Sequence, residues 1–179
     1  SFIVTSRDPR KKAAEKRVKR AEPPKTPAAK RPRYNYSGKE YLLVDGYNII
    51  FAWDELRETA KKSLDLARRR LIDRVANYQG FRGCEAIIVF DAYKVKENPG
   101  KFEKEGNLGI VYTKEAQTAD AYIEKTAHDL SKTHRVRVAT SDGAEQMIIL
   151  GSGAIRVPAA AFHAEVCEAE KVIREMLKI

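Results

Sequence analysis

The sequence has few of the features that build disulfide-rich, zinc-binding or membrane-spanning proteins. Its two cysteines, Cys84 and Cys167, form neither a CxxC pair nor a cluster with histidine. A lone pair of this kind is neither a disulfide framework nor a zinc site, and we expect two small buried apolar groups in a reducing cytosol. The chain has no run of 18 apolar residues and no signal-peptide core near residue 1. A cytoplasmic protein without a membrane segment is therefore predicted.

Several phosphate-binding motifs are missing as well. The GxxxxGK[ST] pattern of a P-loop does not occur. Gly151-Ser152-Gly153 is the nearest match to a dinucleotide motif, but it follows a predicted helix and precedes a predicted strand, which is the reverse of the required order. A dehalogenase-type phosphatase needs a second aspartate two residues after Asp45, where Tyr47 stands. The three histidines show no ligand spacing, and we expect surface or packing roles for them.

The charge is distributed unevenly along the chain. Residues 1–39 contain 13 lysines and arginines against 3 acidic residues, whereas residues 40–179 contain 21 against 22. Five of the seven prolines also fall within the first 32 residues. Such a segment cannot offset its ordering entropy by burial, so residues 1–37 are predicted to be a disordered basic, Pro-rich arm or interdomain linker. A solvated linker and an RNA-contacting arm fit this composition equally well.

From residue 38 onward, short apolar runs alternate with amphipathic stretches. Strands are predicted at residues 41–44, 86–90, 108–112, 136–140 and 154–157. Helices are predicted at residues 63–79, 119–130 and about 160–177, with one more that Ser141 or Asp142 caps and that runs through residue 150. Residues 92–107 are polar and glycine-containing, which is typical of a long loop.

The predicted strands are apolar throughout, which favours a parallel sheet covered on both faces. The expected fold class is α/β, as a three-layer sandwich with a mostly parallel sheet of about five strands. One domain over residues 38–179 accounts for all of these elements. In such folds ligands bind at the carboxyl ends of the strands, near the point where the strand order reverses.

Acidic residues gather at that edge of the predicted sheet. Asp45, Asp91 and Asp142 each follow a predicted strand, while Asp120 and Glu124 lie one turn apart on one face of a predicted helix. Each has an ordinary structural explanation as a helix cap, a helix-dipole partner or a turn residue. Convergence of the four aspartates at one edge favours a functional site.

Clustered carboxylates are the hard oxygen ligands that suit Mg²⁺ or Mn²⁺. In phosphodiester hydrolysis such a metal lowers the pKa of a bound water and neutralises the charge that develops on phosphate. Asn48 can hold a water or a phosphate oxygen beside the metal without adding charge, or it can simply close the turn after the first strand.

Four motifs, in this order, resemble the NYN domains of PIN-like ribonucleases, and most closely the YacP-like branch. They span about residues 40–170 and read Val44-Asp45-Gly46-Tyr47-Asn48, Val89-Phe90-Asp91-Ala92, Thr118-Ala119-Asp120 with Glu124, and Thr140-Ser141-Asp142-Gly143-Ala144-Glu145-Gln146. The resemblance implies a PIN-like fold and metal-dependent endonucleolytic cleavage of RNA. The expected catalytic residues are Asp45, Asp91, Asp120, Asp142 and Asn48. The expected metal ligands are Asp45, Asp120, Asp142 and Glu124.

YacP-like proteins are associated with mRNA cleavage on translating ribosomes, so the resemblance also implies mRNA and the ribosome as partners. Similar domains are appended to translation GTPases. Because the chain begins at Ser1, we expect it to be the carboxyl-terminal part of a larger translation-factor-like protein, or to have a processed terminus.

Basic and aromatic residues provide candidate contacts to RNA. The candidate phosphate contacts are Lys94, Lys96, Lys101, Lys104, Arg68 and Arg69, although exposed basic residues are often only solvated. Tyr47, Phe51 and Trp53 are candidates to line a channel for single-stranded bases, with core packing favoured for Phe51. The alternative to a ribonuclease is a non-catalytic RNA- or ribosome-binding module. The four acidic positions favour the enzyme, because an anionic cluster repels RNA unless a metal bridges them.

Overall fold

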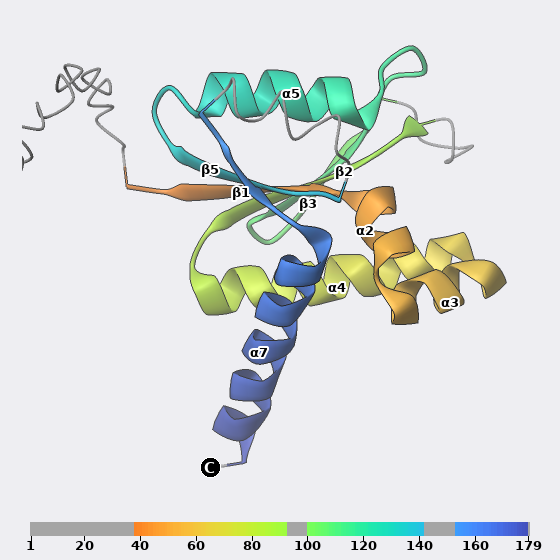
Figure 1. Ribbon diagram of the computed structural model, residues 1–179, viewed down its shortest axis with the longest axis vertical. Helices are drawn as coiled ribbons and strands as arrows, with labels where there is room; N and C mark the ends of the chain where they lie inside the picture. Colours follow the sequence, from red (N-terminus) through yellow and green to blue (C-terminus); the bar gives the residue numbers. More distant parts are fainter. Residues whose placement is uncertain (1–37, 93–99, 142–152, 179) are drawn as a thin grey trace, which may run out of the picture. The chain divides into compact units, whose positions relative to one another are not determined.

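The computed structural model describes residues 38–92, 100–141 and 153–178, all of which belong to the unit Tyr34–Ile179. Within them, six strands form one sheet in the order β3-β4-β2-β1-β5-β6 (Figure 1). The strands are β1 (Glu40–Asp45), β2 (Glu85–Phe90), β3 (Phe102–Glu105), β4 (Leu108–Tyr112), β5 (Arg135–Ala139) and β6 (Ile155–Val157). Every neighbouring pair is parallel except β3 with β4.

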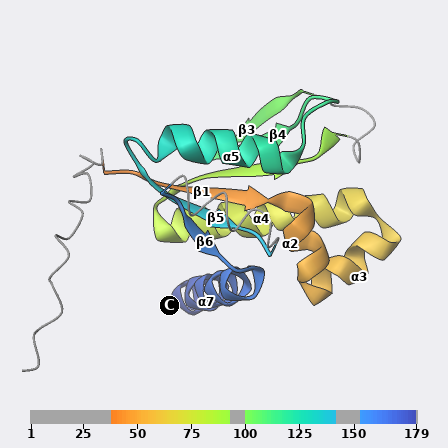
Figure 2. The same cartoon turned by 45° about the horizontal axis from the view of Figure 1, so that its top comes forward.

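Helices cover both faces of this sheet, which confirms the predicted three-layer α/β fold (Figure 2). One face carries α5 (Ala119–Leu130). The other carries α2 (Gly46–Ala52), α3 (Asp54–Lys62), α4 (Leu64–Arg82) and α7 (Ala159–Leu177). None of the helices in the described part of the chain has the length and apolarity needed to cross a bilayer.

The core consists of two apolar clusters, one on each side of the sheet. Leu42 and Val44 of β1 pack into the cluster that contains the buried residues of α4 and α7, whereas Leu43 packs into the cluster beneath α5. Successive side chains of a strand point to opposite faces, so a strand covered on both sides has no polar alternation. This is why the strands of this chain are apolar throughout.

Side-chain caps set the starts of two of the predicted helices. The Ser63 hydroxyl accepts a hydrogen bond from the Leu66 amide and begins α4, and Thr118 does the same for α5 through the Ala121 amide. The predicted end of α4 at residue 79 is wrong, because the helix continues through Gly80 to Arg82. It ends at Gly83, whose φ of 73° is a left-handed conformation that favours glycine.

The segment after β1 differs from the prediction of a turn. Gly46-Tyr47-Asn48 begins α2 directly, and α3 follows after Trp53. Gly46 is required here by space: a Cβ at this position would overlap the Phe90 ring and lie 3.0 Å from the Val89 carbonyl oxygen. The close approach of α2 to the end of β2 therefore depends on glycine.

The predicted loop over residues 92–107 is wrong for its second half. Phe102–Glu105 forms β3 and pairs antiparallel with β4, and the Phe102 ring packs over Gly109 of that neighbour. A charged four-residue strand has little apolar pattern, which explains why the sequence indicated a loop. The predicted helix through residue 150 falls on residues 142–152, which lie outside the described residues.

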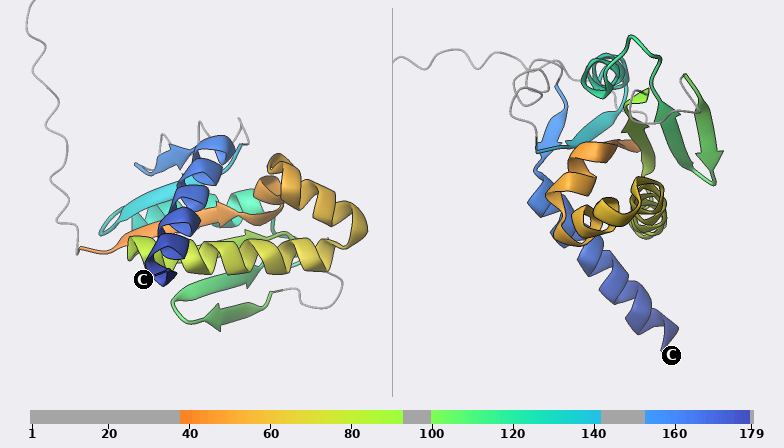
Figure 3. Two further views of the ribbon diagram at one scale, coloured as in Figure 1. Left: turned by 90° about the horizontal axis from the view of Figure 1, so that it is seen from below. Right: turned by 90° about the vertical axis from the view of Figure 1, so that its right-hand side faces the viewer.

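The helix layer opposite α5 is joined by ion pairs between arginines and glutamates. Arg74 binds Glu55 of α3 at 2.6 Å and Glu170 of α7 at 2.8 Å, with its guanidinium 5.0 Å from the centre of the Trp53 ring. Nearby, Arg137 of β5 binds Glu165 of α7 at 2.7 Å. We call this region, defined by Arg74, Arg137, Glu55, Glu165 and Glu170, the α4–α7 seam. Beyond the seam, α7 extends away from the sheet (Figure 3).

Candidate active site

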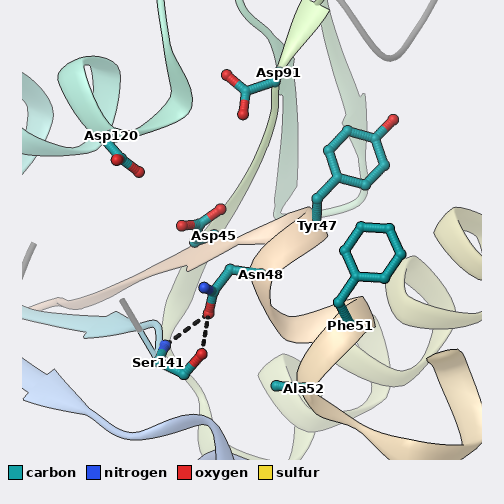
Figure 4. Close-up of a pocket in the computed structure, with 8 residues that line it drawn as sticks. All are labelled: Asp45, Tyr47, Asn48, Phe51, Ala52, Asp91, Asp120 and Ser141. Atoms are coloured by element: carbon teal, nitrogen blue, oxygen red, sulfur yellow. Dashed lines mark hydrogen bonds between the residues drawn. The ribbon is translucent and has the colours of Figure 1, made fainter. Parts of the chain in front are cut away.

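A cleft of about 420 Å³ opens at the carboxyl end of the sheet. Here β2 and β5 flank β1, and the strand order reverses because the chain builds from β1 through β2 to β4 before it returns to β5. At such a reversal in an α/β sheet, the segments that follow two neighbouring strands run to opposite faces, and a crevice remains between them. The sequence predicted a ligand site at this place. The cleft is lined by Asp45, Tyr47, Asn48, Phe51, Ala52, Asp91, Asp120 and Ser141 (Figure 4).

Asp45 is the last residue of β1 and is only 6% exposed. It occupies the position before the first turn of α2, but its side chain does not cap that helix. Instead, the Thr140 hydroxyl at the end of β5 donates to its Oδ2 at 3.5 Å. Burial of a carboxylate carries a desolvation cost, which hydrogen bonds such as this one offset.

Asp91 links two elements of the site. It follows β2, and its Oδ1 accepts a short hydrogen bond of 2.6 Å from the backbone amide of Ala119, the first residue of α5. This bond satisfies one of the amides that a helix leaves unpaired at its start. Asp91 thereby fixes the beginning of α5, and with it the position of Asp120 in the first turn. Asp120 thus lies in the first turn, where its expected helix-dipole role would place it, whereas Asp91, expected as a turn residue, binds the start of the helix.

Asn48 connects α2 to the end of β5. Its Oδ1 accepts from the Ser141 backbone amide at 2.6 Å and from the Ser141 hydroxyl at 2.9 Å (Figure 4). The predicted turn-closing role of Asn48 is wrong, because the residue lies in a helix and holds a segment 93 positions away. Since the oxygen is engaged, a contact from Asn48 to a phosphate would come from its amide nitrogen.

Aromatic side chains form one wall of the cleft. Tyr47 is buried, whereas Phe51 is 44% exposed, so the expected core packing of Phe51 is wrong. Trp53 is the residue that belongs to the core, where its Nε1 donates to the Ala159 carbonyl at 2.9 Å. Burial raises the pKa of the Tyr47 hydroxyl, although Arg68 opposes this by donating to it at 3.0 Å.

One predicted metal ligand does not line this cleft, and another cannot be placed relative to it. Glu124 is exposed one turn further along α5, while Asp142 lies outside the described residues. Within residues 38–92, 100–141 and 153–178, no three acidic, histidine or cysteine side chains converge closely enough to hold an ion. The donor set nevertheless has the right chemistry, because Asp45, Asp91 and Asp120 supply hard carboxylate oxygens of the kind that Mg²⁺ and Mn²⁺ prefer.

The predicted phosphate contacts are mostly engaged with acidic neighbours. Arg68 is paired with Asp65 and Tyr47, Arg69 with Asp73 and Glu105, and Lys101 with Glu103. Lys104 is exposed on β3, and Lys94 and Lys96 lie outside the described residues. Contact with RNA stays a prediction for all six.

Sequence reasoning missed how the end of β5 contributes. Ser141 had been assigned to a helix cap and Thr140 to the strand, yet Ser141 lines the cleft and Thr140 reaches Asp45. The only signal for this role was their place immediately before Asp142 in the fourth motif. A hydrogen bond between residues about 95 positions apart leaves no local pattern.

Comparison with known proteins identifies the family. The model of the YacP-like NYN domain matches residues 42–179. The chain belongs to the YacP-like NYN family. This is a family of PIN-like nucleases, and the match spans the whole cleft described above.

Bacterial relatives support this assignment. The chain is 41% identical over 142 residues to the uncharacterized protein YacP of Bacillus subtilis strain 168, covering 78% of this chain and 82% of that protein. Two crystal structures of Rae1 (YacP) from Bacillus subtilis, both at 38% identity, are similar in fold. A mutant form has a TM-score of 0.68 over 78% of this chain and 82% of that one. A second structure has a TM-score of 0.66 over 77% and 79%.

Proposed function

We propose that this YacP-like NYN domain is a metal-dependent endoribonuclease that cleaves single-stranded RNA. The observation that carries the proposal is that Asp45, Asp91 and Asp120, which come from three separate segments, line one cleft. Three carboxylates in one cleft repel each other and a polyanionic substrate, so the arrangement is favourable when a cation is bound. Messenger RNA in a ribosomal context is the substrate that the sequence resemblance implies.

Each lining residue has a distinct role in this proposal. Asp45 and Asp120 would hold Mg²⁺ or Mn²⁺, with Asp142 as a further predicted ligand. Asp91 positions Asp120 through its bond to the first amide of α5. When bound, the metal would lower the pKa of a water and offset charge on the phosphate. The amide nitrogen of Asn48 donates to a phosphate oxygen, because its oxygen is occupied by Ser141.

Cleavage of a labelled single-stranded RNA, and of a translated mRNA, tests the proposal. We expect cleavage with Mg²⁺ or Mn²⁺ and none with EDTA. Asp45→Asn and Asp120→Asn should each lower the rate by at least about 10²-fold, since each removes charge where the transition state needs it. The matched control is Glu168→Gln, which makes the same change at an exposed position of α7.

Thermal unfolding of each variant ensures that lost activity does not reflect lost structure. RNA binding without cleavage under either metal would favour the non-catalytic module instead. Unchanged cleavage by both aspartate variants would contradict the mechanism even if the wild-type protein cuts RNA.

A further inference from the structure

Four aromatic rings form a continuous column from the core to the cleft. Tyr112 stacks on Phe90 with ring centres 5.7 Å apart, Phe90 lies 5.1 Å from Tyr47, and Tyr47 stacks on Phe51 at 6.5 Å. The planes of the first and last pairs are inclined by only 22° and 28°. We call these four rings the aromatic column.

The two ends of the aromatic column differ in exposure. Tyr112, Phe90 and Tyr47 are all buried, but Phe51 is 44% exposed and lines the cleft beside the three aspartates. The core-facing positions of α2 are already filled by Tyr47, Ile49 and Ile50. Phe51 therefore presents apolar surface to a cleft whose other side chains are largely polar, and packing of the core does not require it there.

The neighbours of Phe51 hold it in position. Tyr47 supports its ring and is itself held by the hydrogen bond from Arg68. The Phe51 carbonyl also accepts from Arg57 at 3.4 Å, a contact that restrains the backbone rather than the ring. A ring that is fixed before the ligand arrives loses little conformational entropy on binding, so its contact contributes more fully to affinity.

We propose that Phe51 is the stacking platform for a nucleobase next to the scissile phosphodiester. This inference rests on the proposed function, since it assigns a binding role within the same cleft. An aromatic ring stacks on any base because every base has a π face, so the platform would be tolerant of sequence. It also requires an unstacked base, which a duplex does not offer, so it would select single-stranded RNA.

Binding measurements without turnover test the platform separately from catalysis. The full 179-residue chain is titrated into a fluorescent single-stranded RNA of about ten nucleotides, with Ca²⁺ in place of Mg²⁺. Phe51→Ala should weaken binding by about 5- to 100-fold, as the loss of one stacked base predicts. Phe51→Trp should restore it, whereas Phe51→Leu, which keeps apolar volume without a π face, should not.

Phe81 provides a matched control. Its exposed fraction of 45% is nearly the same as that of Phe51. It lies near the end of α4, just before β2 begins, and therefore at the amino ends of the strands, opposite the cleft. Phe81→Ala should leave RNA affinity unchanged. Equal losses from Phe51→Ala and Phe81→Ala would overturn the proposal, because a general effect of exposed apolar surface would then explain both.

Combining the Phe51→Ala variant with modified RNAs identifies the stacked base. One abasic position in the RNA should weaken binding by the wild-type chain, and the same change should have no further effect on Phe51→Ala. Fully additive effects at every position would overturn the platform. If this coupling is found but Mg²⁺ supports no cleavage, the proposed catalytic function fails while the platform stands.

Discussion

The cleft and the α4–α7 seam both contain several carboxylates, but they neutralise them differently. In the seam, Glu55 and Glu170 share Arg74, and Glu165 binds Arg137. In the cleft, Asp91 accepts from a backbone amide and Asp45 from a threonine hydroxyl, both of which are neutral donors. In the described residues, the seam therefore pairs its carboxylates with arginines, whereas the cleft brings three carboxylates together.

This difference separates structural from functional acidic residues. An ion pair between a helix and its neighbour fixes their packing, and removing either member costs stability. A group of carboxylates that share one cleft adds repulsion to the folded state, which is a recurrent property of binding sites. We therefore expect the stability of the cleft to depend on how closely its walls pack, and the stability of the seam to depend on its ion pairs.

The largest effect on stability should come from a substitution of Gly46, where the wall of the cleft is closely packed. Gly46→Ala would force a methyl group into the Phe90 ring, which is buried between Tyr47 and Tyr112. We expect a loss of about 3 kcal/mol in the free energy of unfolding, at the upper end of overpacking effects, measured by urea denaturation. RNA cleavage should fall as well, because Phe90 supports Tyr47.

Gly80 offers the matched control for this change. It lies within α4, and a Cβ there would have no atom within 4 Å. Gly80→Ala should raise stability by about 0.5 to 1 kcal/mol, since alanine favours a helix interior over glycine. A loss for Gly46→Ala no greater than about 0.5 kcal/mol would show that the wall adapts and that its shape is not fixed.

A smaller effect is expected where the seam depends on charge. Arg74→Met keeps most of the side-chain volume but removes the partner of Glu55 and Glu170 and the contact with the Trp53 ring. Because these carboxylates remain partly solvated, we expect a loss of about 2 kcal/mol in the free energy of unfolding. The rate of RNA cleavage at a temperature where the variant is folded should not change.

Arg57→Met makes the same substitution at an exposed residue whose ion pair is with Asp54 of the same helix and whose other bond is a long one to the Phe51 carbonyl. Its effect on the free energy of unfolding should stay within about 0.5 kcal/mol. If Arg74→Met lowers cleavage while the protein remains folded, the seam and the cleft are coupled, and the separation drawn between them fails.

The smallest effect concerns the acid stability of the seam. Burial alone would raise the pKa of Glu55, but the hydrogen bonds from Arg74 and His163 outweigh it and lower the pKa from 4.5 to about 2. A folded pKa below the unfolded one stabilises the protein above pH 4.5, and this contribution is lost as the pH falls from about 4.5 to about 2. Glu55 is about half exposed, so the contribution should stay below about 1 kcal/mol.

Glu55→Gln tests this contribution through the pH dependence of unfolding. The variant should be slightly less stable than the wild type at pH 7, and the two should approach each other as the pH falls below 4.5. A constant difference down to pH 2.5 would show that ionisation of Glu55 contributes nothing.

The sequence predicted most of the fold because its strands carry a local signal. The prediction for α5 was correct at both ends, since Thr118 caps it and Ala119, Ile123 and Ala127 repeat on one face. The strand at residues 108–112 was also correct, because five consecutive buried residues form a distinct apolar run. The proximity of Asp45 and Asp91 followed from the parallel sheet, because the carboxyl ends of its strands lie together, whereas Asp120 comes from the first turn of α5.

What the sequence could not predict depends on contacts between distant segments. Gly46-Tyr47-Asn48 is a typical turn sequence, but it starts a helix that lies so close to Phe90 that only glycine fits at position 46. The exposure of Phe51 and the burial of Trp53 depend on where α7 packs, because Trp53 lies against Phe162 and donates to Ala159. A helix of only two turns, such as α2, has too few residues for its sequence pattern to show which face is buried.

The edges of the sheet affect how the protein behaves when many copies are crowded together. An open strand is a template on which another chain can add a strand, and long apolar edges promote aggregation. Here β3 has four residues, of which Glu103, Lys104 and Glu105 are charged, and β6 has only three residues with Arg156 at its centre. Strand addition at either edge would bury these charges. At one of its two edges, the sheet that carries the acidic cleft is thus protected against self-association by the same short, charged strand that the sequence had presented as a loop.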